Sequence, residues 1–421
     1  MEIKTSKPVD KGKKRLFKNW YYLTVLQIAQ FAVPFIPIPY LVRVLSPEKF
    51  GLVAFAVAMS QVFAVFVEYG FSYSAVKGIA IFKKDPAKVC EIYSCAIIIK
   101  ALIAVVLTAV FLLCAFFIPQ IAQEKTLFFF AFLMIYSDIF FTTWFFQGYE
   151  KMKYIAWLTL IVECLYVLSV FIFIRSANDY IYVPLLDAVC YFVIGIISII
   201  IIRKKFGVPL KFQPVSRIIF HFKRSWHYFV SDFASNVYSA ASVFILGFIA
   251  PSAVVGYYRA ALSVLPPIKA LFEPVVQAAY PYMSKNAVEN KERALYFLKT
   301  YSFAVALAAF AVSAILFLSS DLIVKIFLGA QYQSSSLILK IFSPIPFLYA
   351  LNMIFALHIM YPFGMKVNFA KTTAWSAIIS FALIPVLAVF FQGAGMAAIM
   401  VIGELFISLV CYAKIRKTIK I

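Results

Sequence analysis

Ionisable side chains interrupt the long apolar stretches of this sequence at several points. Such a group near the centre of a bilayer costs about 2.5–3.5 kcal/mol on insertion scales, so each is a candidate for function. The basic residues could hold an anionic ligand, and the acidic residues could couple an ion or form internal pairs. The basic candidates are Lys100, Lys269 and Arg259, and the acidic candidates are Asp138, Glu163, Asp187 and Glu273, with Glu404 in a similar setting.

A polar stripe follows one face of the helix expected over residues 226–250. At 100° per residue, Asp232 and Asn236 fall with Ser235, Ser239 and Ser242 within an arc of about 120°. A weaker stripe begins at Gln27 in the first apolar run. We expect the two stripes to line a cavity and to contact substrate. The alternative is that they join packed helices by hydrogen bonds.

Lys269 and Glu273 are four residues apart, which on a helix also favours an ion pair across one turn. Arg259 lies about 80° around the same helix from Lys269, so both side chains are expected to face one cavity. For Arg259, near the outer end, the alternative is that its long side chain reaches the membrane surface.

Other chemistry finds no support in the residue pattern. The six cysteines and three histidines are scattered, without the clustering of a metal site. No GxxxxGK[ST] motif is present, so the chain has no P-loop for ATP. We therefore predict no cofactor, no metal and no catalytic residues.

The elements that position the candidate residues are membrane helices. Hydrophobic residues make up 64% of the 421 residues and charged residues only 14%, too few to cover a water-facing surface of this length. Apolar runs of about 20 residues, the length of a membrane-crossing helix, recur along the chain. We predict about twelve spans, near 19–43, 52–76, 92–118, 126–148, 154–175, 180–202, 226–250, 256–282, 296–318, 336–362, 372–391 and 394–413.

The basic residues orient these spans. With the N-terminus inside, 30 of the 39 Lys and Arg residues fall in cytoplasmic segments and five outside. Both termini are therefore predicted to be cytoplasmic. The net charge of +21 is explained as a rim that attracts anionic lipid headgroups, and no nucleic-acid partner is expected.

The predicted fold is an all-α membrane protein with two six-helix bundles around a central cavity. A basic tail (1–18) precedes the first bundle (19–205), and a basic cytoplasmic linker (206–225) precedes the second bundle and its tail (226–421). Both halves have a tight external turn about 26 residues after a tryptophan, ending at Gly51 in one half and Gly256 in the other. Prolines such as Pro34, Pro266 and Pro385 are expected to kink helices for alternating access.

Several stretches give the chain a resemblance to a known family. They are 39–51 (PYLVRVLSPEKFG), 68–72 with 74–77 (EYGFS, SAVK), 146–154 (FQGYEKMKY), 256–261 with 279–285 (GYYRAA, AYP, SK), and 321–323 with 327–329 (DLI, FLG). The chain resembles the Wzx-type polysaccharide-transport flippases, within the superfamily that also holds multidrug and toxin extruders. Ser46, Glu68 and Arg259 depart from the usual Gly, Asp and small residue.

The resemblance implies a bacterial inner-membrane protein that moves an undecaprenyl-pyrophosphate-linked oligosaccharide to the periplasmic leaflet for O-antigen-like polysaccharide. The partners implied are this glycan, membrane lipids, a polysaccharide polymerase and a chain-length regulator. A drug or cation extruder of the same superfamily is the alternative, and a membrane polymerase or ligase a more distant one. The glycan, the coupling ion and the oligomeric state stay open.

Overall fold

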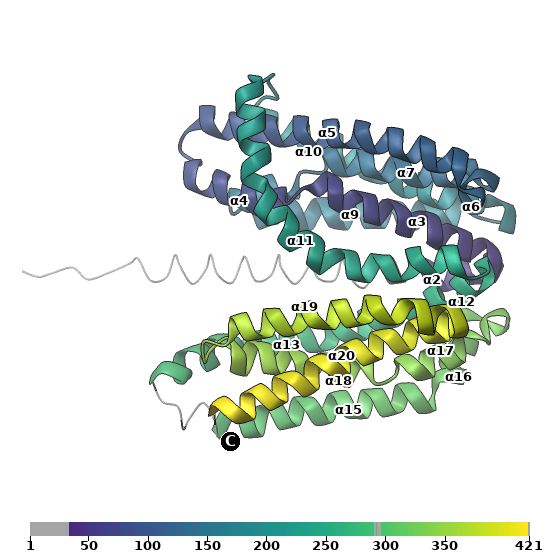
Figure 1. Ribbon diagram of the computed structural model, residues 1–421. Helices are drawn as coiled ribbons and strands as arrows, with labels where there is room; N and C mark the ends of the chain where they lie inside the picture. The colour runs from purple at the N-terminus through teal and green to yellow at the C-terminus, as the bar shows by residue number, and fades with distance from the viewer. Residues whose placement is uncertain (1–32, 290–291, 293–295, 420–421) are drawn as a thin grey trace, which may run out of the picture. The chain divides into compact units, whose positions relative to one another are not determined.

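Helices follow one another along the chain in the computed structural model, which describes residues 33–289, 292 and 296–419 (Figure 1). Among these residues there are helices and turns and no strand. The first half contains η1 (Val33–Phe35), α2 (Pro37–Val44), α3 (Pro47–Glu68), α4 (Phe71–Phe82), α5 (Pro86–Phe117), α6 (Pro119–Gln123), α7 (Lys125–Phe140), α8 (Thr143–Gly148), α9 (Met152–Phe173), η2 (Ala177–Ile181) and α10 (Tyr182–Phe206).

The second half continues from a helix of 35 residues, α11 (Val215–Ile249). After it come α12 (Ser252–Ser263), α13 (Leu265–Glu289), η3 (Leu298–Ser302), α15 (Phe303–Leu318), α16 (Ser320–Ile323), η4 (Val324–Leu328), η5 (Ala330–Tyr332), α17 (Ser335–Phe342), α18 (Ile345–Met353), η6 (Ile354–Met360), α19 (Lys366–Leu383), η7 (Ile384–Ala388) and α20 (Val389–Ile419).

The helix pattern agrees with about twelve membrane spans. Eight stretches of the described chain are long and apolar enough to cross a membrane. The longest of them, Lys366–Thr418, has 53 residues and must cross twice, because 1.5 Å per residue makes it far longer than a bilayer is thick. It is interrupted at Gln392, whose φ of 48° is not helical, where the sequence predicted a boundary between two spans.

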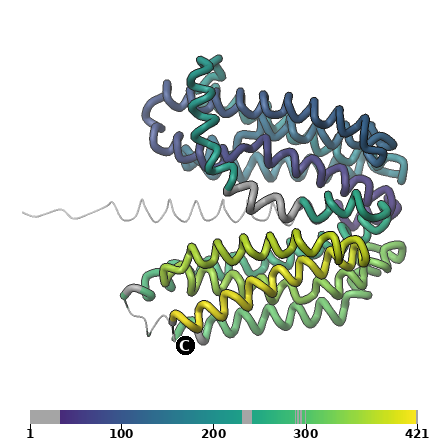
Figure 2. The backbone as a smooth tube through the Cα atoms, in the orientation of Figure 1, coloured from purple at the N-terminus to yellow at the C-terminus, as the bar shows by residue number. Residues whose placement is uncertain are grey.

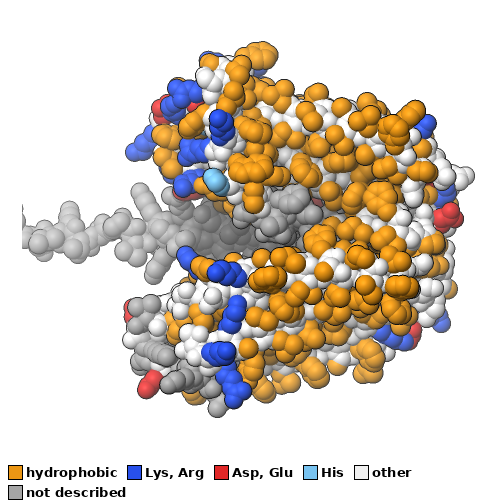
Figure 3. Space-filling view, in the orientation of Figure 1, with side chains coloured by type: hydrophobic (Ala, Val, Ile, Leu, Met, Phe, Trp, Pro, Cys, Tyr) orange, Lys and Arg blue, Asp and Glu red, His pale blue; other side chains and the backbone are white. Residues whose placement is uncertain are grey.

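The chain forms two compact units, each of which takes residues from both halves of the sequence. Unit 1 contains residues up to Pro37 and Ala56–Ala240, and unit 2 contains Ile38–Phe55 and Ala241–Ile421. Helices α3 and α11 therefore each contribute to both units (Figure 2). On the face drawn in Figure 3, hydrophobic side chains cover the flanks of the helices in each unit, while most Lys and Arg lie near one end and a few near the other. The predicted division into two six-helix bundles stays a prediction.

A tight turn between α3 and α4 places two aromatic residues and a carboxylate in unit 1. Tyr69 and Gly70 both have positive φ, 46° and 71°. A Cβ on Gly70 would lie 2.5 Å from the backbone nitrogen of Phe229 on α11, so only glycine fits. The close approach packs the ring of Tyr69 on Phe229, with centroids 5.1 Å apart, and leaves Glu68 at the end of α3.

The turn before α3 is held within unit 2 by residues from far along the chain. Arg43 donates to the carbonyl of Ile326 at 2.6 Å, and the side-chain amide of Gln331 donates to the carbonyls of Val42 and Leu45. The amide of Gln331 thus pairs carbonyls at the end of α2, which have no partners within the helix, while Arg43 pairs a carbonyl of η4. The segment 38–55 is thus an integral part of unit 2 although it lies early in the sequence.

Candidate functional site

Lys100 lies in the interior of unit 1, in an ion pair that the sequence did not predict. Its side chain on α5 is 1% exposed, and its ammonium donates to the carboxylate of Glu68 at the end of α3. The same carboxylate accepts from the hydroxyl of Ser72 on α4, and the ring of Trp144 lies 6.0 Å from the lysine nitrogen. The charge of Lys100 is therefore neutralised by Glu68. This arrangement favours an internal ion pair over the binding of an anionic ligand by Lys100.

Three further carboxylates of unit 1 lie close enough to influence one another. Asp138 on α7 is within electrostatic range of Lys100, and Asp187 on α10 is within range of both Asp138 and Glu163. Glu163 on α9 is buried and accepts from the hydroxyl of Tyr191 at 2.6 Å. The structure thus brings together three of the four acids that the sequence proposed for ion coupling or pairing, and the fourth, Glu273, lies in unit 2.

Among the side chains that the structure describes, the membrane interior of unit 1 has more negative than positive groups. The four carboxylates just described stand beside one ammonium, that of Lys100. Such an excess of carboxylates would attract a cation into this interior. The coupling role of these acids stays a prediction.

Lys269 and Glu273 in unit 2 do not form the ion pair that their spacing suggests. Glu273 instead accepts from the hydroxyl of Tyr349 on α18, at 2.7 Å, and the ammonium of Lys269 lies 4.7 Å from the centroid of the same ring. The phenol separates the two charges because it takes the carboxylate and presents its face to the lysine. The positive charge of Lys269 is thus less completely neutralised than that of Lys100.

Glu404 on α20 completes the polar interior of unit 2. Its carboxylate accepts from the side-chain amide of Asn352 on α18 at 2.7 Å, and Asn352 in turn accepts from Ser408 at 2.8 Å. Asn352 and Ser408 are buried, so these bonds satisfy polar groups that would otherwise be costly in an apolar setting. They tie α18 to α20 beside the residues that face Lys269.

The remaining predicted site residues are placed only in part. Arg259 is half-buried on α12 in unit 2. Gln27 lies outside the described residues. Asp232 and Asn236 lie on α11, where the backbone is described but the side chains from 231 to 240 are not. Their proposed place in a cavity stays a prediction.

Sequence reasoning missed the partners of the charged residues. Glu68 could have been found, because it is an ionisable side chain within an apolar stretch, like the candidates that the sequence analysis selected. Tyr191 and Tyr349 gave no such signal, because tyrosine is common in membrane proteins and only the fold shows which hydroxyl meets a carboxylate.

Comparisons with known proteins assign the chain to a family. Residues 16–287 match the family described as "Polysaccharide biosynthesis protein". The chain belongs to this family. Two relatives are both named "Putative O-antigen transporter". The protein from Escherichia coli (strain K12) is 28% identical over 94% of this chain and 96% of its own length. That from Shigella dysenteriae is 30% identical over 86% and 90%.

Two solved structures have the same fold as this member of the polysaccharide biosynthesis family. One is an inward-facing multidrug resistance MATE family transporter, with a TM-score of 0.68, 16% identity and coverage of 96% and 98% of the two chains. The other is the lipid II flippase MurJ in an inward closed conformation, with a TM-score of 0.66, 14% identity and coverage of 91% and 87%. These two likenesses show the fold; the family match and the two relatives, which the chain covers over most of their length, identify it as a membrane transport protein rather than an enzyme.

Proposed function

We propose that this protein is a flippase that moves an undecaprenyl-pyrophosphate-linked oligosaccharide repeat unit from the cytoplasmic to the periplasmic leaflet of the inner membrane, for O-antigen-like polysaccharide. The main observation in support is that the membrane interior of each unit holds charged groups with specific partners. Lys100 is paired with Glu68, and Glu273 is bound by Tyr349. Buried charges are costly in lipid and mark a path for polar cargo. The relatives named as O-antigen transporters support this substrate class.

Lys269 is the proposed contact for the pyrophosphate. Its ammonium faces an aromatic ring and has no ion pair with the neighbouring Glu273, so an anionic group can approach it at lower cost than it can approach Lys100. Arg259, Asp232, Asn236 and Gln27 are proposed to line the path for the sugar. The polyprenyl tail stays in lipid throughout, because only the headgroup is polar.

Alternating access is the proposed mechanism. The external turn of the first half packs within unit 2, through Arg43 and Ile326 and through Gln331 and Leu45. Because all these residues belong to unit 2, the external turn is expected to move together with unit 2 during transport. The membrane potential contributes: an inside-negative potential favours outward movement of an anion by about 2.3 kcal/mol per charge per 100 mV.

The experiment that tests the proposal is deletion of the gene in its own host. A flippase predicts loss of surface polysaccharide with lipid-linked repeat units retained at the inner leaflet, and restoration of the polysaccharide by the wild-type chain. The proposed topology places both termini in the cytoplasm. A polysaccharide polymerase and a chain-length regulator are the proposed protein partners, because their substrate is what the flippase delivers.

One observation favours a second function, export of drugs or cations. The described part of the interior of unit 1 has four carboxylates for one ammonium, which suits a cationic substrate as well as a coupling ion. The same deletion strain separates the two functions. Increased sensitivity to cationic drugs with normal surface polysaccharide would support the extruder and exclude the flippase.

A further inference from the structure

The first part of α11, residues 215–230, differs from the other helices of unit 1 in direction. It crosses the ends of α4 and α5, whereas α3, α5 and α7 run along one another (Figure 1). We call residues 215–230 the linker helix, because they follow the segment that joins the two halves of the sequence. Three faces of this helix have three different characters.

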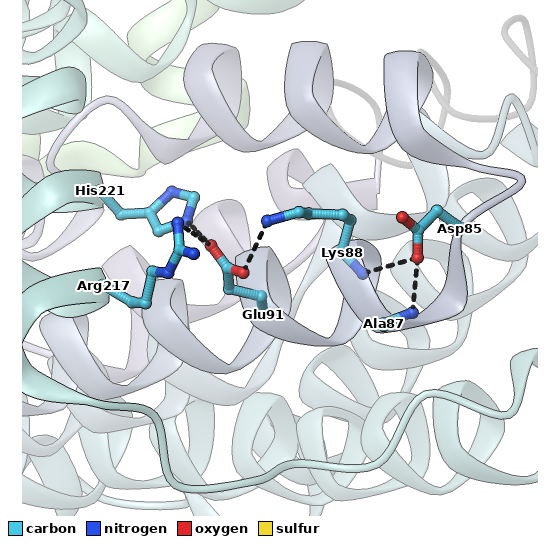
Figure 4. A network of polar contacts seen from close by, with 6 residues as sticks. All are labelled: Asp85, Ala87, Lys88, Glu91, Arg217 and His221. Carbon is cyan, nitrogen blue, oxygen red and sulfur yellow. Dashed lines mark hydrogen bonds and ion pairs between the residues drawn. The ribbon is translucent and has the colours of Figure 1, made fainter.

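One face is docked on unit 1. The imidazole of His221 lies 3.2 Å from the carboxylate of Glu91 on α5, and the guanidinium of Arg217 lies 3.8 Å from it (Figure 4). One turn further on, the hydroxyl of Ser225 lies 2.8 Å from that of Ser74 on α4. His221 and Ser225 are buried, so these contacts fix the rotation of the helix about its own axis.

A second face is an exposed apolar stripe. At 100° per residue its five members fall within an arc of about 80°, next to the docked face. The exposed fraction of these side chains runs from 42% to 69%. Apolar side chains gathered this closely mark a surface that is covered in the working state of the protein. The stripe consists of Val215, Ile219, Phe222, Trp226 and Val230.

The third face is basic. Arg224 lies about opposite the apolar stripe, beside the docked Arg217, and Lys223 lies at the edge of the stripe. Residues 207–230 include no Asp or Glu, and the preceding end of α10 adds Arg203, Lys204 and Lys205. A helix with an apolar stripe, a basic face and no acid is complementary to an anionic lipid surface.

We propose that the linker helix lies in the cytoplasmic membrane–water interface and binds anionic phospholipid, with its apolar stripe among the acyl chains and its basic face at the phosphates. Lipid is the occupant that matches both the charge and the position, because the helix crosses the ends of membrane-spanning helices. The linker helix thereby anchors unit 1 to the leaflet at the point where α11 leaves for unit 2.

Trp226 allows the position of the stripe to be measured. The full-length chain is reconstituted in phosphatidylglycerol-containing vesicles, with and without lipid brominated in the middle of its acyl chains, and the emission of Trp226 is taken as the difference between wild type and Trp226→Phe. We expect bromination to reduce this difference emission by about half or more. The exposed Trp157 on α9 is the positive control, and the buried Trp144 is the negative control.

An unquenched Trp226 beside a quenched Trp157 would overturn the proposal, whether water, another protein or a second copy of the chain covers the stripe. The quenching experiment does not measure transport, so its result is independent of whether the protein is a flippase.

The choice of anionic lipid is tested separately. Lys223→Gln/Arg224→Gln is compared with Lys366→Gln/Lys371→Gln, which removes the same charge from the predicted cytoplasmic side of unit 2. Phosphatidylglycerol retained by the purified protein, relative to phosphatidylethanolamine, is measured by mass spectrometry. We expect a decrease of at least about twofold in the linker variant alone. An equal decrease in both variants would show a general charge effect and contradict a specific site.

Discussion

Gly51 packs against the turn that precedes Gly256, and Gly256 packs against the turn that precedes Gly51, both within unit 2. The packing is so close that neither position has room for a side chain. A Cβ on Gly51 would lie 1.7 Å from the carbonyl oxygen of Ser252, and one on Gly256 would lie 2.0 Å from that of Pro47. Each glycine follows the external turn of its own half of the sequence. The contact therefore joins equivalent points of the two halves at the predicted periplasmic end.

Gly51→Ala is expected to force these turns apart, because a backbone carbonyl cannot move aside as a side chain can. Overpacking of this kind costs about 1–3 kcal/mol. We expect greater labelling of a cysteine placed at Ser252 by an impermeant reagent, and reduced export. Gly393→Ala is the matched control, since its Cβ would meet only side-chain atoms at 3.2 Å. Equal labelling in the Gly51→Ala and Gly393→Ala variants would contradict a role for the contact between Gly51 and Gly256.

Removal of one member of the Lys100–Glu68 pair is expected to be more harmful than removal of both charges. Lys100→Ala leaves carboxylates in an apolar interior, and breaking a buried pair costs about 3–5 kcal/mol. The double variant Lys100→Met/Glu68→Gln should recover most of the thermal stability in detergent. If it also restores surface polysaccharide, Lys100 serves pairing and does not contact substrate. A double variant as unstable as Lys100→Ala would argue against the pair.

Lys269 is expected to matter for transport more than for stability. Lys269→Ala should lower surface polysaccharide at least about tenfold at equal protein level, whereas Lys269→Arg keeps the positive charge and should retain part of the activity. Lys325→Ala, on η4 between α16 and η5, is the matched lysine control. Normal polysaccharide in Lys269→Ala would exclude it as the pyrophosphate contact.

Docking of the linker helix is expected to weaken as the pH falls. Burial lowers the pKa of His221, an effect that outweighs the opposite influence of Glu91, and nearby Arg224 and Lys88 act in the same direction as burial. The undocked helix, with an ordinary histidine pKa of about 6.5, then binds a proton that the docked helix does not. Docking should be complete near pH 7.5 and weaker towards pH 5.5.

Hydrogen exchange of residues 215–230 measures this dependence. His221→Gln should remove most of it, while His227→Gln, at an exposed position of the same helix, should leave it unchanged. The same pH dependence in wild type and His221→Gln would assign the effect to another group.

The elements could be predicted from the sequence because membrane helices depend on local composition. The break near Gln392, for example, follows from a polar residue and glycines between two apolar runs. Pairing could not be predicted in this way. Lys100 and Glu68 are 32 residues apart, and Tyr349 is 76 residues from the Glu273 that it binds, so only tertiary packing brings them together.

Local spacing was misleading where a distant residue competed. Lys269 and Glu273 have the spacing of a helical ion pair, yet the phenol of Tyr349 takes the carboxylate. The two external turns were recognised as equivalent in sequence, but their direct contact through Gly51 and Gly256 depends on the fold of unit 2.

The central claim is tested most directly by reconstitution of the purified chain with an undecaprenyl-pyrophosphate-linked saccharide. The measured quantity is the rate at which saccharide added to one leaflet becomes accessible to an impermeant glycosidase on the other side. We predict a rate well above that of protein-free vesicles, increased by a potential negative on the cytoplasmic side and reduced in Lys269→Ala. A rate equal to that of protein-free vesicles, from protein that remains folded, would contradict the account.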